Sequence, residues 1–146
     1  MAVVQKCVFV PYSAAQMFAL VEQVEDYPQF LPWCDAVKLL SRSEDALTAT
    51  LSINYHGIKQ SLTTENKNQA PHKMEMHLVS GPFKHLYGVW TFTELRTDAC
   101  KIEFELRYEF SSKLLENLIG PVFGKIGDSF VDAFCLRADQ VYLKSE

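Results

Sequence analysis

The chain has 146 residues, of which 48% are hydrophobic and 22% charged, as expected for a globular domain and not for a disordered segment. A chain of this length buries a sizeable core without disulfides or metals. The formal net charge of −4 argues against nonspecific binding of nucleic acid, which needs an excess of lysine and arginine facing phosphates. We therefore expect a single domain over residues 1–146 that binds no DNA.

The cysteine pattern and the N-terminus both favour a cytoplasmic protein. Most of the cysteines lie in apolar segments and they form no CxxC pair, so we expect reduced, mostly buried thiols. The first ten residues are interrupted by Gln5 and Lys6 and lack the layout of a signal peptide. No run is long and apolar enough to span a membrane. The four cysteines are Cys7, Cys34, Cys100 and Cys135.

The N-terminal quarter predicts a strand followed by helix. Residues 3–10 are apolar and β-branched, and Pro11 ends that strand. Ser13 and Gln16 have the spacing of a capping box, which begins a helix. This helix should end near Asp26, because Pro28 disfavours helical backbone at the residue before it. Its apolar stripe consists of Met17, Leu20, Val21 and Val24. Residues 27–33 form a proline-bracketed turn or short helix.

Residues 36–110 change to an apolar period of two, which predicts antiparallel strands with one apolar and one polar face. A tight turn at His56-Gly57 would pair Tyr55 with Ile58, and hence Leu51 with Leu62.

A second turn at residues 80–82 would place Met76 opposite Leu86 and, on the polar face, His77 opposite His85. Two exposed histidines without a third ligand make a poor zinc site, so we expect no metal.

The C-terminal segment, residues 112–143, returns to helical spacing. Its Gly120-Pro121 step should kink the helix or begin a second piece. One broad apolar face contains Ile119, Val122, Phe123, Ile126, Phe130, Ala133, Phe134 and Val141. The long helix is the element able to cover the apolar face of the sheet, which predicts an α+β fold with a curved antiparallel sheet wrapped around the C-terminal helix.

Several segments, in order along the chain, resemble the START-like superfamily (polyketide cyclase, SRPBCC), in the branch of coenzyme Q-binding proteins and ribosome-association toxins. These segments are residues 12–18, 27–34, 80–86, 90–92 and 133–138. The resemblance implies a helix-grip (START/Bet v 1-like) fold with two short helices after the first strand. It also implies a cavity between sheet and helix that accepts ubiquinone, and no cofactor.

Three functions are compatible with this resemblance. The first is a carrier or chaperone for a lipophilic molecule, most simply ubiquinone, that supports respiration, with transient contact at the inner membrane. The second is a ribosome-association toxin that binds a ribosomal subunit and blocks subunit joining. The third and weakest is a polyketide cyclase-like enzyme. We find no catalytic motif and no inward carboxylate pair, and the plausible inward ionisable groups, Tyr55 and Tyr108, are explained by packing.

The candidate ligand-binding residues come from four groups, each with a structural alternative. Glycines on one side of the C-terminal helix would leave space for a ligand or pack closely on the sheet. Inward strand and helix residues would line a cavity or fill a core. Residues 30–33 would form a lid, touch a membrane, or cap the sheet rim. Gln60, with Thr64, would meet a quinone carbonyl or lie near solvent. The candidates are Phe30, Pro32, Trp33, Gln60, Met74, Met76, Leu86, Trp90, Phe92, Phe104, Phe123, Gly124, Gly127, Phe130 and Phe134.

A ribosome-binding role would instead need a basic surface patch. The outward residues of the last strand, at positions 101–109, sum to a charge of −1, so that surface is not the patch. The candidates on neighbouring strands are Lys59, Lys67, Lys73 and Lys84.

Overall fold

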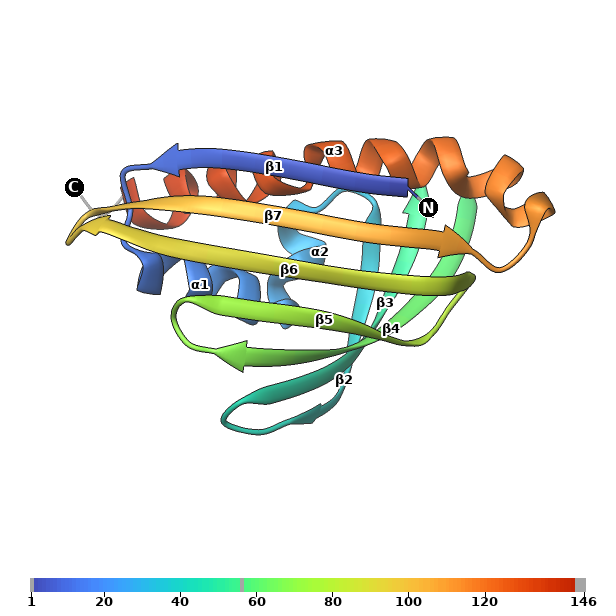
Figure 1. The fold of residues 1–146 in the computed structure, drawn as a ribbon, viewed down its shortest axis with the longest axis horizontal. Coiled ribbons are helices and arrows are strands. Elements are labelled where there is room, and N and C mark those ends of the chain that lie inside the picture. Colours follow the sequence, from blue (N-terminus) through green and yellow to red (C-terminus); the bar gives the residue numbers. More distant parts are fainter. Residues whose placement is uncertain (1, 56, 144–146) are drawn as a thin grey trace.

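In residues 2–55 and 57–143, which the computed structural model describes, seven strands form one antiparallel sheet in the order β1-β7-β6-β5-β4-β3-β2 (Figure 1). The long strands twist so strongly that β3 and β4 cross the direction of β6 and β7. The strands are β1 (Ala2–Val10), β2 (Cys34–Arg42), β3 (Ala46–Tyr55), β4 (Ile58–Gln69), β5 (Lys73–Ser80), β6 (Phe83–Arg96) and β7 (Ala99–Phe110).

The helices lie on the concave side of this sheet (Figure 1). They are α1 (Ala14–Glu22), the 3₁₀ helix η1 (Val24–Asp26), α2 (Tyr27–Phe30) and α3 (Lys113–Tyr142). The predicted capping box is present: the Gln16 amide donates to the Ser13 hydroxyl over 3.1 Å, and the Ser13 amide donates to the Gln16 side chain over 2.9 Å. The predicted helix end near Asp26 is wrong: α1 ends at Glu22, and Gln23, with a ψ of 68°, separates it from η1. Tyr27, the residue before Pro28, has helical backbone and begins α2. The predicted helix-grip fold is confirmed.

The β3–β4 pairing agrees with the sequence. Leu51 lies opposite Leu62 and Tyr55 opposite Ile58. Gly57 adopts a φ of +85°, a left-handed conformation that glycine accepts without strain. The other predicted turn residue, His56, lies outside the described residues.

The predicted β5–β6 pairing is wrong by two residues. Met76 lies opposite Gly88, not Leu86, and His77 lies opposite Tyr87, not His85. The connection is wider than a tight hairpin because Ser80 pairs back onto β4 beyond a bulge, while Phe83 already pairs with β7. A shift of two preserves which face each side chain occupies, so the apolar faces remain together.

The helix α3 is continuous through Pro121, so of the two predicted alternatives, a kink or a second piece, the second piece is wrong. Pro121 lies on the exposed side, near the exposed Asn117, where water can replace the lost helical hydrogen bond. The buried face matches the prediction except at Val141, which is 36% exposed because Tyr142 instead packs against Tyr12. No helix within the described residues is long and apolar enough to cross a membrane.

The cysteines divide between core and surface. Cys34 and Cys100 are buried, Cys135 is half-buried and Cys7 on β1 is exposed; all four are free thiols. Burial raises the pKa of the Cys34 and Cys100 thiols to about 11, so both stay protonated and unreactive near neutral pH.

Close packing of α3 on the sheet requires a glycine at position 127 but not at position 124. A methyl group added at Gly127 would lie 2.9 Å from Cγ2 of Val4, a β-branched side chain of β1. A methyl group at Gly124 would meet no atom within 4 Å. Gly127 therefore permits helix–sheet contact, whereas Gly124 only weakens the helix.

Replacing each of these glycines by alanine should have opposite effects on stability. We expect Gly127→Ala to lower the free energy of unfolding by about 1–3 kcal/mol through overpacking. Gly124→Ala should raise it by up to about 1 kcal/mol through helix propensity. Urea unfolding of both variants checks this. Equal effects of the two substitutions would contradict the close contact between Gly127 and Val4. Adding Val4→Ala to Gly127→Ala should restore part of the lost free energy of unfolding.

Candidate ligand-binding cavity

An apolar cavity of about 70 Å³ separates the inner face of the sheet from the helices. Strands β3, β4, β5, β6 and β7 form one wall, and η1, α2 and α3 contribute to the other. The lining residues are Val24, Tyr27, Trp33, Ala49, Leu51, Ile53, Leu62, Thr64, Asn66, Met76, Leu86, Phe104, Leu106, Phe123, Ile126, Gly127 and Phe130.

Two aromatic clusters contribute to the walls of this cavity. In the first, Phe130 of α3 packs against Trp33, Trp90 and Phe104, with ring centroids 5.5–5.8 Å apart. In the second, the ring centroid of Phe123 lies 4.9 Å from that of Phe83 and 4.8 Å from that of Tyr108. Edge-to-face and tilted ring pairs such as these stabilise the walls beyond the area that they bury.

A second cavity of about 20 Å³ continues the apolar space along α3. Four residues line both cavities: Ile53, Leu62, Phe123 and Ile126. The smaller cavity also touches Ile58 and Pro82, at the β3–β4 and β5–β6 turns, and Ile119 of α3. The apolar interior therefore extends from the centre of the sheet towards these turns.

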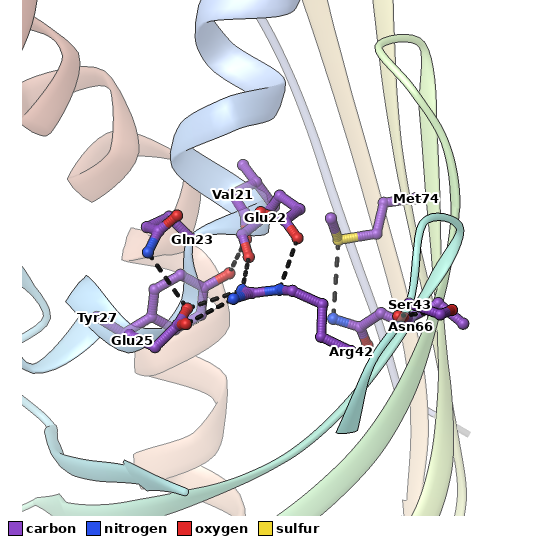
Figure 2. Close-up of polar contacts among 10 residues, drawn as sticks. Val21, Glu22, Gln23, Glu25, Tyr27, Arg42, Ser43, Asn66 and Met74 are labelled. Carbon is purple, nitrogen blue, oxygen red and sulfur yellow. Dashed lines mark hydrogen bonds and ion pairs between the residues drawn. The ribbon is translucent and has the colours of Figure 1, made fainter. Parts of the chain in front are cut away.

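Polar groups are few in the larger cavity. The Thr64 hydroxyl donates to the Asn66 side-chain oxygen over 3.1 Å, and both residues are buried. The Tyr27 hydroxyl donates to the Val21 carbonyl oxygen over 2.5 Å (Figure 2). Burial raises the pKa of Tyr27 far above its usual value, so the phenol stays neutral. Among the lining residues, Tyr27 is the one ionisable side chain, which leaves the wall without an acid–base pair.

Seven of the predicted ligand-binding residues line the larger cavity, namely Trp33, Met76, Leu86, Phe104, Phe123, Gly127 and Phe130. Gln60 lines the smaller one with Phe123. The remaining predicted residues lie in neither lining. Met74, Trp90, Phe92 and Phe134 are at most 1% exposed and form core behind the cavity wall. Gly124 is half-buried on α3.

Of the alternatives for residues 30–33, a lid, a membrane contact or a cap on the sheet rim, the burial of the segment favours the cap. Leu31 and Trp33 are buried, and Phe30 lies half-buried beneath the Arg137 guanidinium, 5.2 Å from the ring centroid. Pro32 alone of the four is exposed. This segment contributes the buried Trp33 to the cavity wall.

Sequence reasoning missed several lining residues. Tyr27, not Tyr55 or Tyr108, brings an ionisable group to the cavity. Asn66 was also missed, although it follows Leu62 and Thr64 in the period of two that defines the inner face of β4. Asn66 was overlooked because its side chain is polar, although the alternation of residues along β4 predicts that this position faces inward.

An ion-pair network ties the sheet edge to the helices beside the cavity (Figure 2). The Arg42 guanidinium, at the end of β2, contacts the Glu25 carboxylate at 2.6 and 2.7 Å and the Glu22 carboxylate at 3.0 Å. It also donates to the Glu22 carbonyl oxygen. This bidentate geometry fastens η1, which supplies Val24 to the cavity, to the edge strand.

The hydrogen bond from Arg42 holds the pKa of the Glu25 carboxyl below its usual range. The pairing therefore stabilises the fold above the glutamate pKa of the unfolded chain, about 4.3, and this contribution is lost as pH falls through the lower folded-state pKa. Because the Glu25 side chain is 37% exposed, solvent screening limits the effect.

Removing this cation should cost stability at neutral pH and not in acid. We expect Arg42→Gln to lower the free energy of unfolding at pH 7 by about 1 kcal/mol or less. The difference from wild type should shrink below pH 4 and in high salt. Denaturant unfolding across pH measures it. Lys113→Gln, which removes the exposed Lys113–Glu116 pair, is the control and should have no measurable effect. A pH-independent loss would contradict the ionic origin.

A curved antiparallel sheet that encloses an apolar cavity against a long C-terminal helix defines the START/Bet v 1-like helix-grip class. The family profile described as "Polyketide cyclase / dehydrase and lipid transport" matches residues 10–135, and the chain belongs to this family.

Among curated proteins, the chain is similar to the ribosome association toxin RatA of Escherichia coli K12, with 42% identity over 139 residues, 95% of this chain and 88% of that protein. It is also similar to the mitochondrial coenzyme Q-binding protein COQ10 homolog B of Xenopus laevis, with 29% identity over 92% of this chain and 57% of that one. Neither relative is named as an enzyme.

Solved structures confirm the fold. A START superfamily protein from Mycobacterium smegmatis has a TM-score of 0.80 at 20% identity, covering 95% of this chain and 98% of that one. The Zhui aromatase/cyclase from Streptomyces sp. R1128 has a TM-score of 0.79 at 14% identity, covering 95% and 94%. The same fold therefore occurs in an enzyme.

Proposed function

We propose that the chain binds an elongated lipophilic molecule of the quinone class in the cavity between the sheet and α3, as a carrier or chaperone and not as an enzyme. The observation that carries this proposal is the continuous apolar lining shared by the two cavities. The name of the coenzyme Q-binding relative supports the quinone class. The scarcity of ionisable groups in the lining supports binding without catalysis.

Burial of a prenyl-type tail supplies enough affinity for this role. Each buried CH₂ contributes about 0.8 kcal/mol, so a few isoprene units reach the roughly 8 kcal/mol of micromolar binding after the entropy cost of association.

The free protein must open before such a ligand fits. Ligand sites commonly enclose about 300–1,000 Å³, whereas the larger cavity has about 70 Å³. Met76 is suited to this adjustment, because its unbranched side chain repacks easily. It lies half-buried against Gly88, whose missing side chain makes room for the Met76 terminal methyl group.

Filling the cavity should abolish binding. Ala49 is 1% exposed and lines the larger cavity, so Ala49→Leu adds three carbons to the space that a ligand would occupy. Protein from a quinone-replete host, extracted with organic solvent and analysed by mass spectrometry, should yield stoichiometric quinone for wild type and traces for Ala49→Leu. Ala46→Leu, on the opposite face of β3, is the matched control and should retain the ligand. An empty wild-type extract, or a folded Ala49→Leu that keeps its quinone, would contradict the proposal.

Association with a ribosomal subunit is the second candidate function. It is supported by 42% identity, across 95% of the chain, to a protein named for this role. The four lysines considered for a basic patch do not form a uniform one. Lys73 pairs with Glu75 at 3.1 Å, and Lys67 lies opposite Glu75 across the β4–β5 pair. Lys59 and Lys84 remain exposed on separate strands.

Cosedimentation separates the two functions. If the chain is a ribosome-association toxin, wild-type protein should migrate with one ribosomal subunit in sucrose gradients and reduce the fraction of joined ribosomes. Ala49→Leu should do the same if the ribosome contact is on the surface, because its change is buried. Protein that stays at the top of the gradient at low and moderate salt would exclude this function.

A further inference from the structure

We propose that Asn66, oriented by Thr64, is the polar anchor of the cavity and selects ligands that carry a carbonyl-type hydrogen-bond acceptor. This inference rests on the proposed binding function and adds to it a determinant of specificity. An apolar cavity alone would bind any hydrocarbon of suitable size. A buried hydrogen-bond donor in its wall would increase the affinity for ligands that carry an acceptor.

The hydrogen bonds of Asn66 engage one hydrogen of its amide nitrogen and leave the other available. The Thr64 hydroxyl occupies the side-chain oxygen, which orients the nitrogen away from Thr64. That nitrogen donates to the Met74 sulfur, 3.8 Å away (Figure 2). A thioether is a weak acceptor, and the amide carries two hydrogens. A carbonyl oxygen in the cavity would be a better partner than the sulfur.

Burial of the Asn66 side chain makes its hydrogen bonding important for ligand affinity. Asn66 is 5% exposed and Thr64 is 6% exposed, and both line the larger cavity. The neighbouring wall is apolar, with Met76 directly opposite Asn66 on β5. The Tyr27 hydroxyl is committed to Val21, so it does not compete for a ligand acceptor. A buried polar group without a good partner is unfavourable, and a ligand that completes its hydrogen bonding gains correspondingly.

The geometry also gives the ligand a direction. An acceptor-bearing headgroup would lie beside Asn66 on β4, in the larger cavity. An apolar tail would run along α3 into the smaller cavity, past Ile53 and Phe123, which line both. Asn68, two residues further along β4, carries the same side-chain amide but lines neither cavity, so it is the matched control for Asn66.

A ligand pair tests the anchor directly. A decyl-substituted benzoquinone and a decylbenzene of the same ring substitution differ mainly in the two carbonyl groups. Equilibrium dialysis should show that wild type prefers the quinone by about three- to tenfold beyond its difference in water solubility. Asn66→Leu should lose this preference while still binding the hydrocarbon, and Asn68→Leu should keep it. Thr64→Val, which frees the amide to rotate, should reduce the preference.

The outcomes distinguish the anchor from the binding function. Equal binding of both ligands by wild type, or a preference that survives in Asn66→Leu or is lost in Asn68→Leu, would overturn the anchor and leave the cavity function intact. Failure of wild type to bind either ligand would overturn both. Circular dichroism and thermal unfolding check each variant. If Asn66→Leu does not fold, Thr64→Val/Asn66→Leu, which also removes the stranded hydroxyl, takes its place.

Discussion

The structure depends on one packing constraint: a single long helix must cover the concave face of a seven-stranded, strongly twisted sheet. The strongest sheet contacts of α3 are with β7 and β1, and it also packs on α1. The absence of a side chain at Gly127 lets the helix approach Val4 of β1 closely. A helix seated against that side of the sheet does not fill the space in front of β3 and β4, and the cavity lies there.

Aromatic rings span the distance from helix to sheet beside this space. Phe130 and Phe123, about two turns apart on α3, both line the cavity and contact rings of the sheet. The rest of the wall is mainly aliphatic and includes the flexible Met76 and the polar pair Thr64 and Asn66. Rigid rings beside a deformable side chain suit a site that must expand around a ligand, because Met76 can repack more easily than the rings.

Polar contacts fasten the rim around the apolar interior. Tyr142 donates to the Gln16 carbonyl oxygen, and Arg137 donates to Gln29, so the C-terminal half of α3 is tied to α1 and α2. Arg42 fastens η1 to the sheet edge. The opposite end of α3 is less covered: Leu114 and Leu118 are exposed where its first turns extend beyond the sheet (Figure 1). These polar contacts therefore hold the C-terminal half of α3, the short helices and the β2 edge of the sheet together.

The sequence by itself determined features set by local geometry: the capping box at Ser13, the Leu51–Leu62 register across a tight turn, and the face that each strand residue occupies. These follow from helix and strand periods and from short connections. Only the tertiary structure decided the β5–β6 register, because pairing with outer strands at Ser80 and Phe83 overrides the local turn. The tertiary structure also decided which inward residues line the cavity, such as Asn66, and which are packed in the core, such as Trp90. The period of two in the sequence predicts the face of the sheet on which a side chain lies, but it does not predict how far that side chain is from α3.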